Sequence, residues 1–510
     1  PTRLADYDPS VTSLTADSRQ VTPGAVFAAL PGTHHHGADF VADALAKGAM
    51  ALILGTDGIY EITVKHAQTG KVPLFVTENP ALVLAKVAAR FYGRQPQNIV
   101  AVTGTNGKTS VSWFCQAIWQ KLGLSAGVIG TIGVFADQQL LANSLTTPSS
   151  VDLHRFLAQM SAKGVAYVAI EASSHGLEQY RLDGARLRAA GFTNLSRDHL
   201  DYHGTMAAYL KAKSTLFSRI LPQDGIAVLN SDVPEFAALN ELAQKRGQTV
   251  FQYGKNAEEL RLLSQNAHED GQELRIAVFG TEYQVNLPLI GEFQAMNALC
   301  ALGLVLAVGA DQNRAVAALS HLPVPPGRAQ VIGRGRKGGI ILIDYAHTPD
   351  ALERILTSLR PLAQNRLLVG FGCGGNRDRG KRPLMGEIAA RIADYVVVTD
   401  DNPRQEEAAV IRQAILKAAQ GVTPCKATVL EMGDRTQAIA HLVSELQEGD
   451  IAVLAGKGHE VGQIIGDKTL PFDDAEMVKA ALRDQGGTLA NERTGSKAKT
   501  SKKAGRGADE

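Results

Sequence analysis

The sequence predicts an α/β protein of three domains, from its length, its alternation of strand-like and helical segments, and two breaks in that alternation. The 510 residues correspond to about three domains of roughly 100–200 residues each. Apolar runs alternate with helical patterns, as in parallel βαβ units. Segments rich in polar residues or proline interrupt this pattern near residues 93–97 and 323–327. These breaks are the expected domain boundaries.

The first domain is expected over residues 1–97, as a small mixed α/β unit. Its apolar runs lie between turn signals such as Pro23-Gly24 and are Ala25–Leu30, Met50–Leu54 and Val72–Thr77. A helical pattern follows over residues 81–91 and leads into the polar segment 93–97, which is typical of a linker.

The central domain is expected over residues 98–326 and should contain a parallel sheet. A buried strand over residues 99–102 runs into a glycine-rich loop and then a helix over about 108–122. Further strands are predicted at Ala126–Ile129, Val165–Ile170 and Ile226–Asn230. The longest apolar run, Ala298–Ala310, is 13 residues and too short for a membrane span of about 20, so a buried helix is expected.

The C-terminal domain is expected over residues 327–490, with a second open α/β sheet. Its predicted strands are Gly339–Ile343, Leu367–Phe371, Tyr395–Thr399 and Ile451–Ala455. Residues 491–510 carry six Lys or Arg and three Asp or Glu, with almost no large apolar side chain. Because such a segment buries too little to offset its ordering entropy, it is predicted to be a disordered basic tail.

Composition excludes several classes of protein. The chain has 52 Lys and Arg against 51 Asp and Glu, which argues against a surface charged throughout for nucleic acid or anionic membrane. Its four cysteines are far apart, so neither a disulfide framework nor a zinc cluster is expected. The N-terminus lacks the basic and apolar regions of a signal peptide. We therefore expect a cytoplasmic protein without a membrane span or a nucleic-acid partner.

The sharpest motif is a phosphate loop between the first central strand and its helix. It consists of Gly104, Thr105, Asn106, Gly107, Lys108, Thr109 and Ser110. Its backbone N–H groups and the helix N-terminus can bind phosphate, Lys108 can reach the outer phosphates, and Thr109 can bind Mg²⁺. Val102 stands where the longer form of the motif has glycine, so this is a shortened variant. An ATP-consuming enzyme and a nucleotide-gated switch or motor both fit, although the guanine motif N-K-x-D is absent.

Acidic and histidine residues downstream indicate a metal site. Glu171 ends a buried strand beside the phosphate loop, where a metal ligand is expected. Residues 194–204 are dense in groups that bind metal or phosphate, including His199. On the residues alone, Lys213 is interpreted as a solvent-exposed helix lysine. The run His34-His35-His36 is interpreted as a polar loop, because adjacent side chains seldom converge on one metal.

Each predicted C-terminal strand ends in a polar loop, and open α/β sheets bind ligands at these ends. Arg377 and Arg404 opposite Glu460 would suit a zwitterion, because guanidinium groups pair with carboxylates and an acid pairs with an amine.

These segments resemble the Mur ligase family of ATP-dependent amide-bond-forming enzymes. The matching motifs are G-T-N-G-K-T-S at 104–110, T-T-P at 146–148, E-A-S-S-H-G-L at 171–177, D-H-L-D-Y-H-G at 198–204, P-G-R at 326–328, D-Y-A-H-T-P at 344–349 and G-K-G-H-E at 456–460. D-N-P-R at 401–404 resembles the motif of the member that adds meso-2,6-diaminopimelate to UDP-N-acetylmuramoyl-L-alanyl-D-glutamate.

The resemblance implies a UDP-substrate-binding domain, a central ATPase domain and a Rossmann-like amino-acid-binding domain. The D-glutamyl carboxylate would be phosphorylated by ATP to an acyl phosphate, which the incoming amine would attack in peptidoglycan precursor synthesis. Mg²⁺ would assist, and the enzyme is expected to be a monomer. A ligase for L-lysine and a folylpolyglutamate synthase are rivals in the same fold, and a nucleotide-gated P-loop binding protein is the rival from another class.

The resemblance also implies roles for individual residues. Lys108, Glu171, His199 and Lys213 would be catalytic, with Thr109, Glu171, His199 and a carbamylated Lys213 serving Mg²⁺. ATP would contact the phosphate loop with Asn297, Arg328 and Asp344. The UDP-substrate would contact Ser18, His34, His35, Thr146, Thr147, Ser173, Gln179 and Arg181. Diaminopimelate would contact Arg377, Asp401, Asn402, Pro403, Arg404, Gly456 and Glu460, with Arg404 on the carboxylate that L-lysine lacks.

Overall fold

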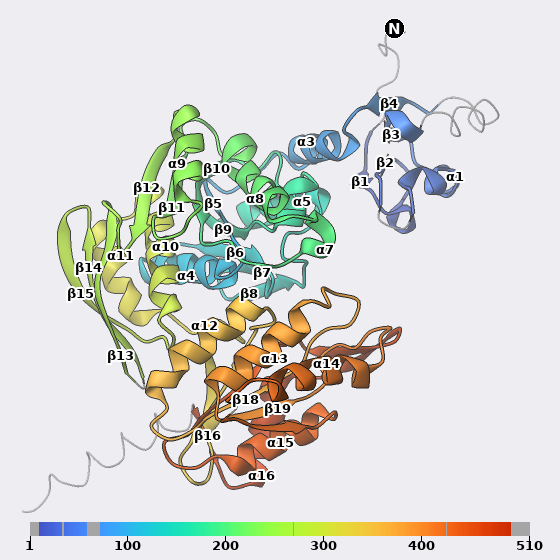
Figure 1. Cartoon of the computed structure of the whole chain (residues 1–510). Coiled ribbons are helices and arrows are strands. Elements are labelled where there is room, and N and C mark those ends of the chain that lie inside the picture. The colour runs from blue at the N-terminus through green and yellow to red at the C-terminus, as the bar shows by residue number, and fades with distance from the viewer. Residues whose placement is uncertain (1–9, 33–34, 59–71, 269, 425, 491–510) are drawn as a thin grey trace, which may run out of the picture.

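A computed structural model describes residues 10–32, 35–58, 72–268, 270–424 and 426–490. Three main sheets follow one another along the chain, each flanked by helices (Figure 1). The predicted three-domain α/β class is confirmed, whereas the exact boundaries 97/98 and 326/327 stay predictions. His34, Cys425 and the predicted tail 491–510 lie outside the described residues.

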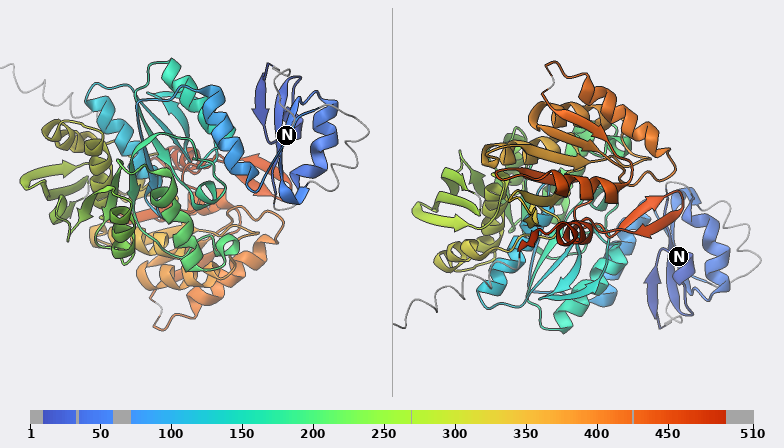
Figure 2. Two further views of the ribbon diagram at one scale, coloured as in Figure 1. Left: turned by 90° about the horizontal axis from the view of Figure 1, so that it is seen from above. Right: turned by 90° about the horizontal axis from the view of Figure 1, so that it is seen from below.

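The N-terminal sheet has four parallel strands in the order β1-β2-β3-β4. They are β1 (Ser13–Thr15), β2 (Ala25–Ala29), β3 (Ala51–Gly55) and β4 (Leu74–Thr77). The helices are α1 (Val41–Ala46), α3 (Pro80–Tyr92) and the 3₁₀ turns η1 (Ser18–Gln20), η2 (Gly37–Phe40) and η3 (Thr56–Gly58). Asn79 caps α3, and Pro80 occupies its first turn. Helix α3 packs against the central domain and joins the two units (Figure 2).

The central sheet has eleven strands in the order β15-β14-β13-β12-β11-β10-β5-β9-β6-β7-β8. Those from β13 to β6 are parallel, and antiparallel strands extend both ends. The bounds are β5 (Asn98–Thr103), β6 (Ala126–Gly130), β7 (Gly133–Ala136), β8 (Gln139–Ala142), β9 (Tyr167–Glu171), β10 (Leu187–Phe192), β11 (Ile226–Asn230), β12 (Thr249–Gly254), β13 (Leu260–His268), β14 (Gly271–Val278) and β15 (Thr281–Leu287). Strands β5, β6, β9 and β11 coincide with the predicted ones within three residues at each end.

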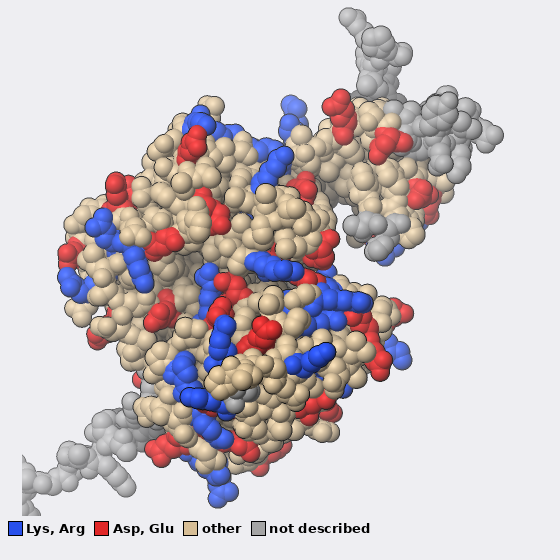
Figure 3. All heavy atoms as spheres, in the orientation of Figure 1, with Lys and Arg blue, Asp and Glu red and all other residues tan. Residues whose placement is uncertain are grey.

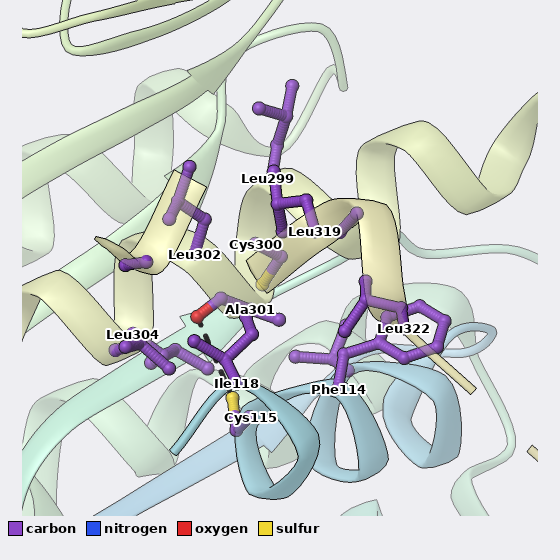
Figure 4. Close-up of a cluster of buried hydrophobic side chains, with 14 of the residues drawn as sticks. Phe114, Cys115, Ile118, Leu299, Cys300, Ala301, Leu302, Leu304, Leu319 and Leu322 are labelled. Carbon is purple, nitrogen blue, oxygen red and sulfur yellow. Dashed lines mark hydrogen bonds between the residues drawn. The ribbon is translucent and has the colours of Figure 1, made fainter. Parts of the chain in front are cut away.

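Helices cover both faces of this sheet. They are α4 (Lys108–Lys121), α5 (Ser150–Ala162), α6 (Ser174–Glu178), α7 (Leu200–His203), α8 (Met206–Thr215), the π-helical η4 (Leu216–Ile220), α9 (Phe236–Lys245), α10 (Phe293–Ala307), α11 (Gln312–Ala318) and η5 (Leu319–His321). Helices α4 and α10 pack together, and Cys115 Sγ on α4 donates to the Ala301 carbonyl on α10 at 3.7 Å (Figure 4). The predicted apolar helix is therefore a core helix. No helix among the described residues is long and apolar enough to cross a membrane.

The C-terminal sheet has seven strands in the order β20-β19-β18-β21-β17-β16-β24, with only β16 and β24 antiparallel. Its strands are β16 (Gln330–Arg334), β17 (Ile340–Asp344), β18 (Leu367–Phe371), β19 (Tyr395–Val398), β20 (Thr428–Glu431), β21 (Ile451–Ala455) and β24 (Thr488–Leu489). Its helices are α12 (Pro349–Leu359), η6 (Arg360–Leu362), α13 (Lys381–Ile392), α14 (Ala408–Gln420), α15 (Arg435–Glu445) and α16 (Asp474–Asp484). A hairpin, β22 (Gly462–Ile465) and β23 (Lys468–Pro471), extends toward the N-terminal domain (Figure 2).

Candidate active site

The phosphate loop joins β5 to α4 at the carboxyl edge of the central sheet. Gly104 and Gly107 have φ of 146° and 90°, in the region that favours glycine. A Cβ on Gly107 would lie 2.3 Å from Asn297 Oδ1, so a larger residue would not fit there. The first backbone N–H groups of α4 have no acceptor within the helix, which makes the loop suitable for phosphate.

Residues after β10 hold this loop in shape. The N–H groups of Thr105 and Asn106 donate to the carbonyl and side-chain oxygens of Asn194, at 2.8 and 3.0 Å. The Thr193 hydroxyl donates to the Asn106 carbonyl at 2.6 Å. Hydrogen bonds to Thr193 and Asn194 therefore fix the conformation of the phosphate loop.

Two lysines meet at the carbonyl oxygen of Gly104. Lys108 Nζ donates to it at 2.9 Å and to the Thr105 carbonyl at 2.8 Å, and Lys213 Nζ donates to it at 2.7 Å. Burial lowers the pKa of Lys108, and the Glu171 carboxylate acts in the opposite direction. Burial, followed by the charge of Lys108, lowers the pKa of Lys213 well below its usual range.

The interpretation of Lys213 as a solvent-exposed lysine is wrong, because its residue is only 1% exposed. Helix α8 lies beneath the phosphate loop, and Lys213 Nζ lies 4.3 Å from the centroid of the Tyr209 ring. The side chain therefore points into the site rather than into solvent.

Glu171, at the end of β9, lies next to Thr109 and is buried. Its Oε2 accepts hydrogen bonds from the hydroxyls of Thr109 and Thr131, both at 3.0 Å, and its Oε1 accepts from the Thr131 N–H at 2.9 Å. Arg328 Nη2 donates to the Thr109 hydroxyl at 3.0 Å. A carboxylate and a hydroxyl this close are hard oxygen ligands of the kind that Mg²⁺ prefers, so these residues fit the ion. Among the described residues, no three or more His, Cys, Asp or Glu form a ready-made metal cluster.

Helices α6 and α7 bring several histidines together. The rings of His175 and His199 are 4.8 Å apart, and those of His175 and His203 are 5.4 Å apart. Burial lowers the pKa of His199 to about 4, opposed by the Asp198 carboxylate, whose Oδ2 lies 3.3 Å from His199 Nε2. His199 is therefore a neutral imidazole at neutral pH and can serve as a ligand.

A cavity of about 280 Å³ lies between the central and C-terminal domains. The central domain contributes the phosphate loop with Thr131, Thr146, Glu171, His199 and Asn297. The C-terminal side contributes Arg328, Asp344, Tyr345, His347 and Arg354. The predicted ATP and metal residues other than Gly104 and Lys213 thus line one cavity, and Lys213 Nζ donates to the Gly104 carbonyl of its phosphate loop.

Asp344 lines this cavity and holds the backbone on its C-terminal side. Its two carboxylate oxygens accept the N–H groups of Ala329 and Ala346, at 2.7 and 2.8 Å. Burial raises the pKa of Asp344, opposed by the Arg328 guanidinium. Arg328 itself lies 4.3 Å from the centroid of the Tyr345 ring. The aspartate thereby holds the backbone on which Arg328 is placed.

Two side-chain contacts join the central and C-terminal domains beside the cavity. The Asn106 amide donates to Asp350 Oδ2 on α12 at 2.7 Å, and Arg197 Nε lies 3.3 Å from Asp378 Oδ2. The phosphate loop is therefore in direct contact with the C-terminal domain.

The residues implied for the UDP-substrate fall into two groups. Thr147 Oγ1 lies 3.0 Å from Ser173 Oγ, and Arg181 bonds to the Thr147 carbonyl at 2.8 Å and to Gln179 Oε1 at 2.6 Å, close to Thr146 in the cavity. Ser18 and His35 instead lie in the N-terminal domain, where His35 stacks edge-on against Phe40 at 6.1 Å.

The residues implied for diaminopimelate meet at the carboxyl edge of the C-terminal sheet. Asn402 Nδ2 donates to Glu460 Oε2 at 2.9 Å, and a Cβ on Gly456 would lie 2.8 Å from Asp401 Oδ2. Pro403 precedes Arg404, whose φ of 53° is left-handed and whose N–H donates to the Ile464 carbonyl at 3.0 Å. Burial lowers the pKa of Arg404, and the neighbouring exposed Arg377 acts in the same direction. Because the two positive charges repel each other, an anion bound beside them would be stabilised.

Sequence reasoning missed several cavity residues. Tyr345 and His347 lie in the D-Y-A-H-T-P motif, and Asn194 begins the polar stretch 194–204, but none of the three is among the residues implied individually for a ligand. Thr131 follows β6, the neighbour of β9 in the sheet, so its position at a strand end was the available signal.

Three family models match the chain in succession. They are the Mur ligase family catalytic domain over residues 10–92, the Mur ligase middle domain over 102–305 and the Mur ligase glutamate ligase domain over 327–458.

Full-length relatives and solved structures also match. A Mesorhizobium japonicum protein named UDP-N-acetylmuramoyl-L-alanyl-D-glutamate–2,6-diaminopimelate ligase is 47% identical over 482 residues, 94% of this chain and 96% of its own. A solved structure of a ligase of the same name is 34% identical and superposes with a TM-score of 0.66, over 93% of this chain and 95% of its own. The MurF ligase of Thermotoga maritima, solved with ADP, shares the fold at 19% identity with a TM-score of 0.63, over 94% of this chain and 99% of its own.

Proposed function

This chain belongs to the Mur ligase family, and we propose that it joins meso-2,6-diaminopimelate to the D-glutamyl residue of UDP-N-acetylmuramoyl-L-alanyl-D-glutamate, using ATP. It is a ligase that forms a carbon–nitrogen bond. The relatives that carry this activity in their names match nearly the whole chain, and the chain retains the D-N-P-R loop beside Glu460. That loop is the observation that carries the choice of amine.

The reaction has two steps. An oxygen of the D-glutamyl carboxylate attacks the γ-phosphorus of ATP, the bond to the β,γ-bridging oxygen breaks, and ADP leaves. The amine nitrogen then attacks the resulting acyl phosphate at its carbonyl carbon. The carbon–oxygen bond breaks, phosphate leaves, and the nitrogen loses a proton to give the amide. Activation is needed because a free carboxylate is a poor electrophile.

The residues of the cavity suit the charge changes in these steps. Lys108 and Arg328 bring positive charge to the edge of the phosphate loop, where the transferred phosphoryl group would lie. The loop N–H groups orient the phosphates before reaction, so little reorganisation is needed.

Thr109, Glu171 and His199 would hold Mg²⁺, which neutralises phosphate charge during transfer. Lys213 is proposed to be carbamylated, since its lowered pKa favours the neutral amine that reacts with carbon dioxide. The carbamate would place a negative charge beside Lys108 and add an oxygen ligand.

The charges of the residues implied for diaminopimelate support this amine over L-lysine. Diaminopimelate is a zwitterion at both ends, whereas the L-lysine side chain ends in an ammonium group alone. Arg404 with Arg377 offers positive charge for the additional carboxylate, and Glu460 with Asp401 offers negative charge for an ammonium. The enzyme is further proposed to act as a cytoplasmic monomer.

Steady-state phosphate release tests the choice of amine. With ATP and the UDP-muramoyl dipeptide supplied, we expect turnover with meso-diaminopimelate and a kcat/KM for L-lysine at least about tenfold lower. Equal or better turnover with L-lysine would reject the proposal in favour of the lysine-adding ligase. ATP hydrolysis stimulated by a folate substrate would instead support a folylpolyglutamate synthase.

A further inference from the structure

The G-K-G-H-E segment contains a lysine for which the proposed reaction has no role. Lys457 follows β21 and is completely buried, with 0% of its residue exposed. Gly456 and Gly458 on either side have φ of 113° and 56°, so the backbone turns sharply around it. A buried ammonium is costly unless specific partners compensate for its lost hydration.

Its partners are two of the residues implied for diaminopimelate. Lys457 Nζ donates to Asn402 Oδ1 at 3.0 Å and to Glu460 Oε2 at 3.4 Å. Asn402 Nδ2 in turn donates to the same Glu460 Oε2 at 2.9 Å. Lysine, asparagine and glutamate therefore form a closed triangle of hydrogen bonds, with the lysine on its buried side.

The triangle fixes which way each polar group points. Asn402 Oδ1 also accepts the N–H of Ile464 at 2.9 Å, so two donors hold its oxygen and direct its NH₂ group to Glu460. Both side-chain donors on Glu460 use Oε2, and among the described residues no hydrogen bond to Oε1 is present. One carboxylate oxygen is thus anchored, and the other can accept from a ligand.

We propose that Lys457 is a positioning residue for the amino-acid substrate, which fixes Asn402 and Glu460 so that Glu460 Oε1 receives an ammonium group of diaminopimelate. This inference rests on the proposed function. Lys457 acts through Glu460 and is not among the residues that line the cavity beside the phosphate loop. Its loss should therefore weaken the binding of one substrate out of three.

The test compares Lys457→Met, Glu460→Gln and the double variant with the wild-type enzyme, measuring KM for each substrate separately. Lys457→Met should raise KM for diaminopimelate by at least about tenfold, as expected for a lost hydrogen bond to a charged group, and leave KM for ATP and for the UDP-substrate unchanged. Because the lysine acts through Glu460, the double variant should be no worse than Glu460→Gln alone. Additive losses, an unchanged KM, or equal rises for all three substrates would overturn the proposal.

Lys479→Met is the matched control, because Lys479 forms an exposed ion pair with Glu476, three positions away like Lys457 and Glu460. It should leave all three KM values unchanged. If Lys457→Met does not fold, Lys457→Gln replaces it in the test, because its amide keeps a hydrogen-bond donor for Glu460. An intermediate KM for diaminopimelate would support the proposal. A wild-type KM would overturn it. A wild-type enzyme that does not use diaminopimelate would refute the proposed function itself, a result distinct from any variant effect.

Discussion

At the scale of single residues, the most unusual group is Lys213, a buried lysine with few polar partners. It shares the Gly104 carbonyl with Lys108, and nothing in its helical spacing distinguishes it from a surface lysine. Its burial depends on how α8 packs under the phosphate loop, a tertiary contact that residue spacing cannot reveal. The family resemblance alone singled it out.

Lys213→Ala tests the proposed carbamate. Activity should fall by at least about 100-fold, the order of loss when one electrostatic stabiliser is removed. A short carboxylic acid in solution should restore part of it by filling the space of the carbamate. Full activity in the variant would refute the role, and the exposed Lys245→Ala serves as the control.

Arg404 is expected to bind the carboxylate that L-lysine lacks. Arg404→Ala should weaken diaminopimelate binding by about 1.5–3 kcal/mol, the contribution of a hydrogen bond to a charged group, without changing the KM for ATP. Titration calorimetry or steady-state kinetics would measure it. Arg391→Ala, which removes an exposed arginine on α13, should have no effect, and an unchanged diaminopimelate KM in Arg404→Ala would count against the assignment.

At the scale of elements, the loops that begin at Asp401 and Gly456 are held by a buried ion pair between α15 and α16. Arg435 and Asp474 are both fully buried and lie 2.7 Å apart. Arg435 also donates to the carbonyls of Asp400 and Ala455, the residues just before Asp401 and Gly456. The pair therefore connects both loops to helices α15 and α16.

Asp474→Ala should leave a buried guanidinium without its partner. The free energy of unfolding is expected to fall by about 3–5 kcal/mol, measured by urea denaturation with a probe in the C-terminal domain. Glu476→Ala, two positions along the same helix in an exposed ion pair, should change stability little. Equal stabilities for the two variants would contradict this account.

Helix α5 carries a buried histidine that should link stability to pH. Burial lowers the pKa of His154, opposed by the hydrogen bond of its Nε2 to the Asp183 carbonyl at 2.9 Å. The unfolded chain, with a pKa near 6.5, therefore takes up a proton before the folded one. The His154 contribution is fully present above about pH 6.5 and is lost as the pH falls toward the lowered pKa.

His154→Asn should consequently show a shallower loss of unfolding free energy than the wild type between pH 7.5 and 5. Urea unfolding at several pH values measures the two slopes. The exposed His268→Asn should follow the wild-type slope. A His154→Asn slope as steep as that of the wild type would show that this histidine does not carry the linkage.

The elements that sequence could predict are those with continuous apolar runs. The central strands β5, β6, β9 and β11 are buried on both faces. Their sequences are therefore nearly continuous apolar runs, which can be recognised without the structure. Strands β13 to β15 were not predicted, because they alternate buried and exposed residues at the antiparallel end of the sheet and include polar positions such as Gln272. Gln272 is buried only because its amide bonds to the Leu289 and Gly291 carbonyls.

At the scale of the whole molecule, positively and negatively charged residues nearly balance, so the surface as a whole has no strong net charge. Residues 1–490 contain 46 Lys and Arg against 48 Asp and Glu, and the two kinds are interspersed over the face seen in Figure 3. We therefore propose that an anionic substrate is bound by a few individual side chains, such as those of Lys108, Arg181 and Arg328, rather than by the net charge of the surface. These residues could be proposed from the sequence. The contact between the phosphate loop and α12, through Asn106 and Asp350, could not be predicted from it.

The candidate site lies between the central and C-terminal domains, and this arrangement supports direct transfer of the activated carboxylate to the amine. The phosphate loop belongs to the central domain, whereas Arg328 and the residues implied for diaminopimelate belong to the C-terminal domain. An enzyme of this construction should transfer the activated carboxylate directly to the amine, without releasing it to water.

Mass spectrometry of the reaction products tests that claim most directly. The protein is incubated with ATP, meso-diaminopimelate and UDP-N-acetylmuramoyl-L-alanyl-D-glutamate labelled with ¹⁸O in its γ-carboxylate. With both γ-carboxylate oxygens labelled, we predict a tripeptide whose mass is that of the two substrates less one H₂¹⁸O, and one ¹⁸O atom in the released phosphate. ATP hydrolysis with no tripeptide, or phosphate without the label, would contradict it.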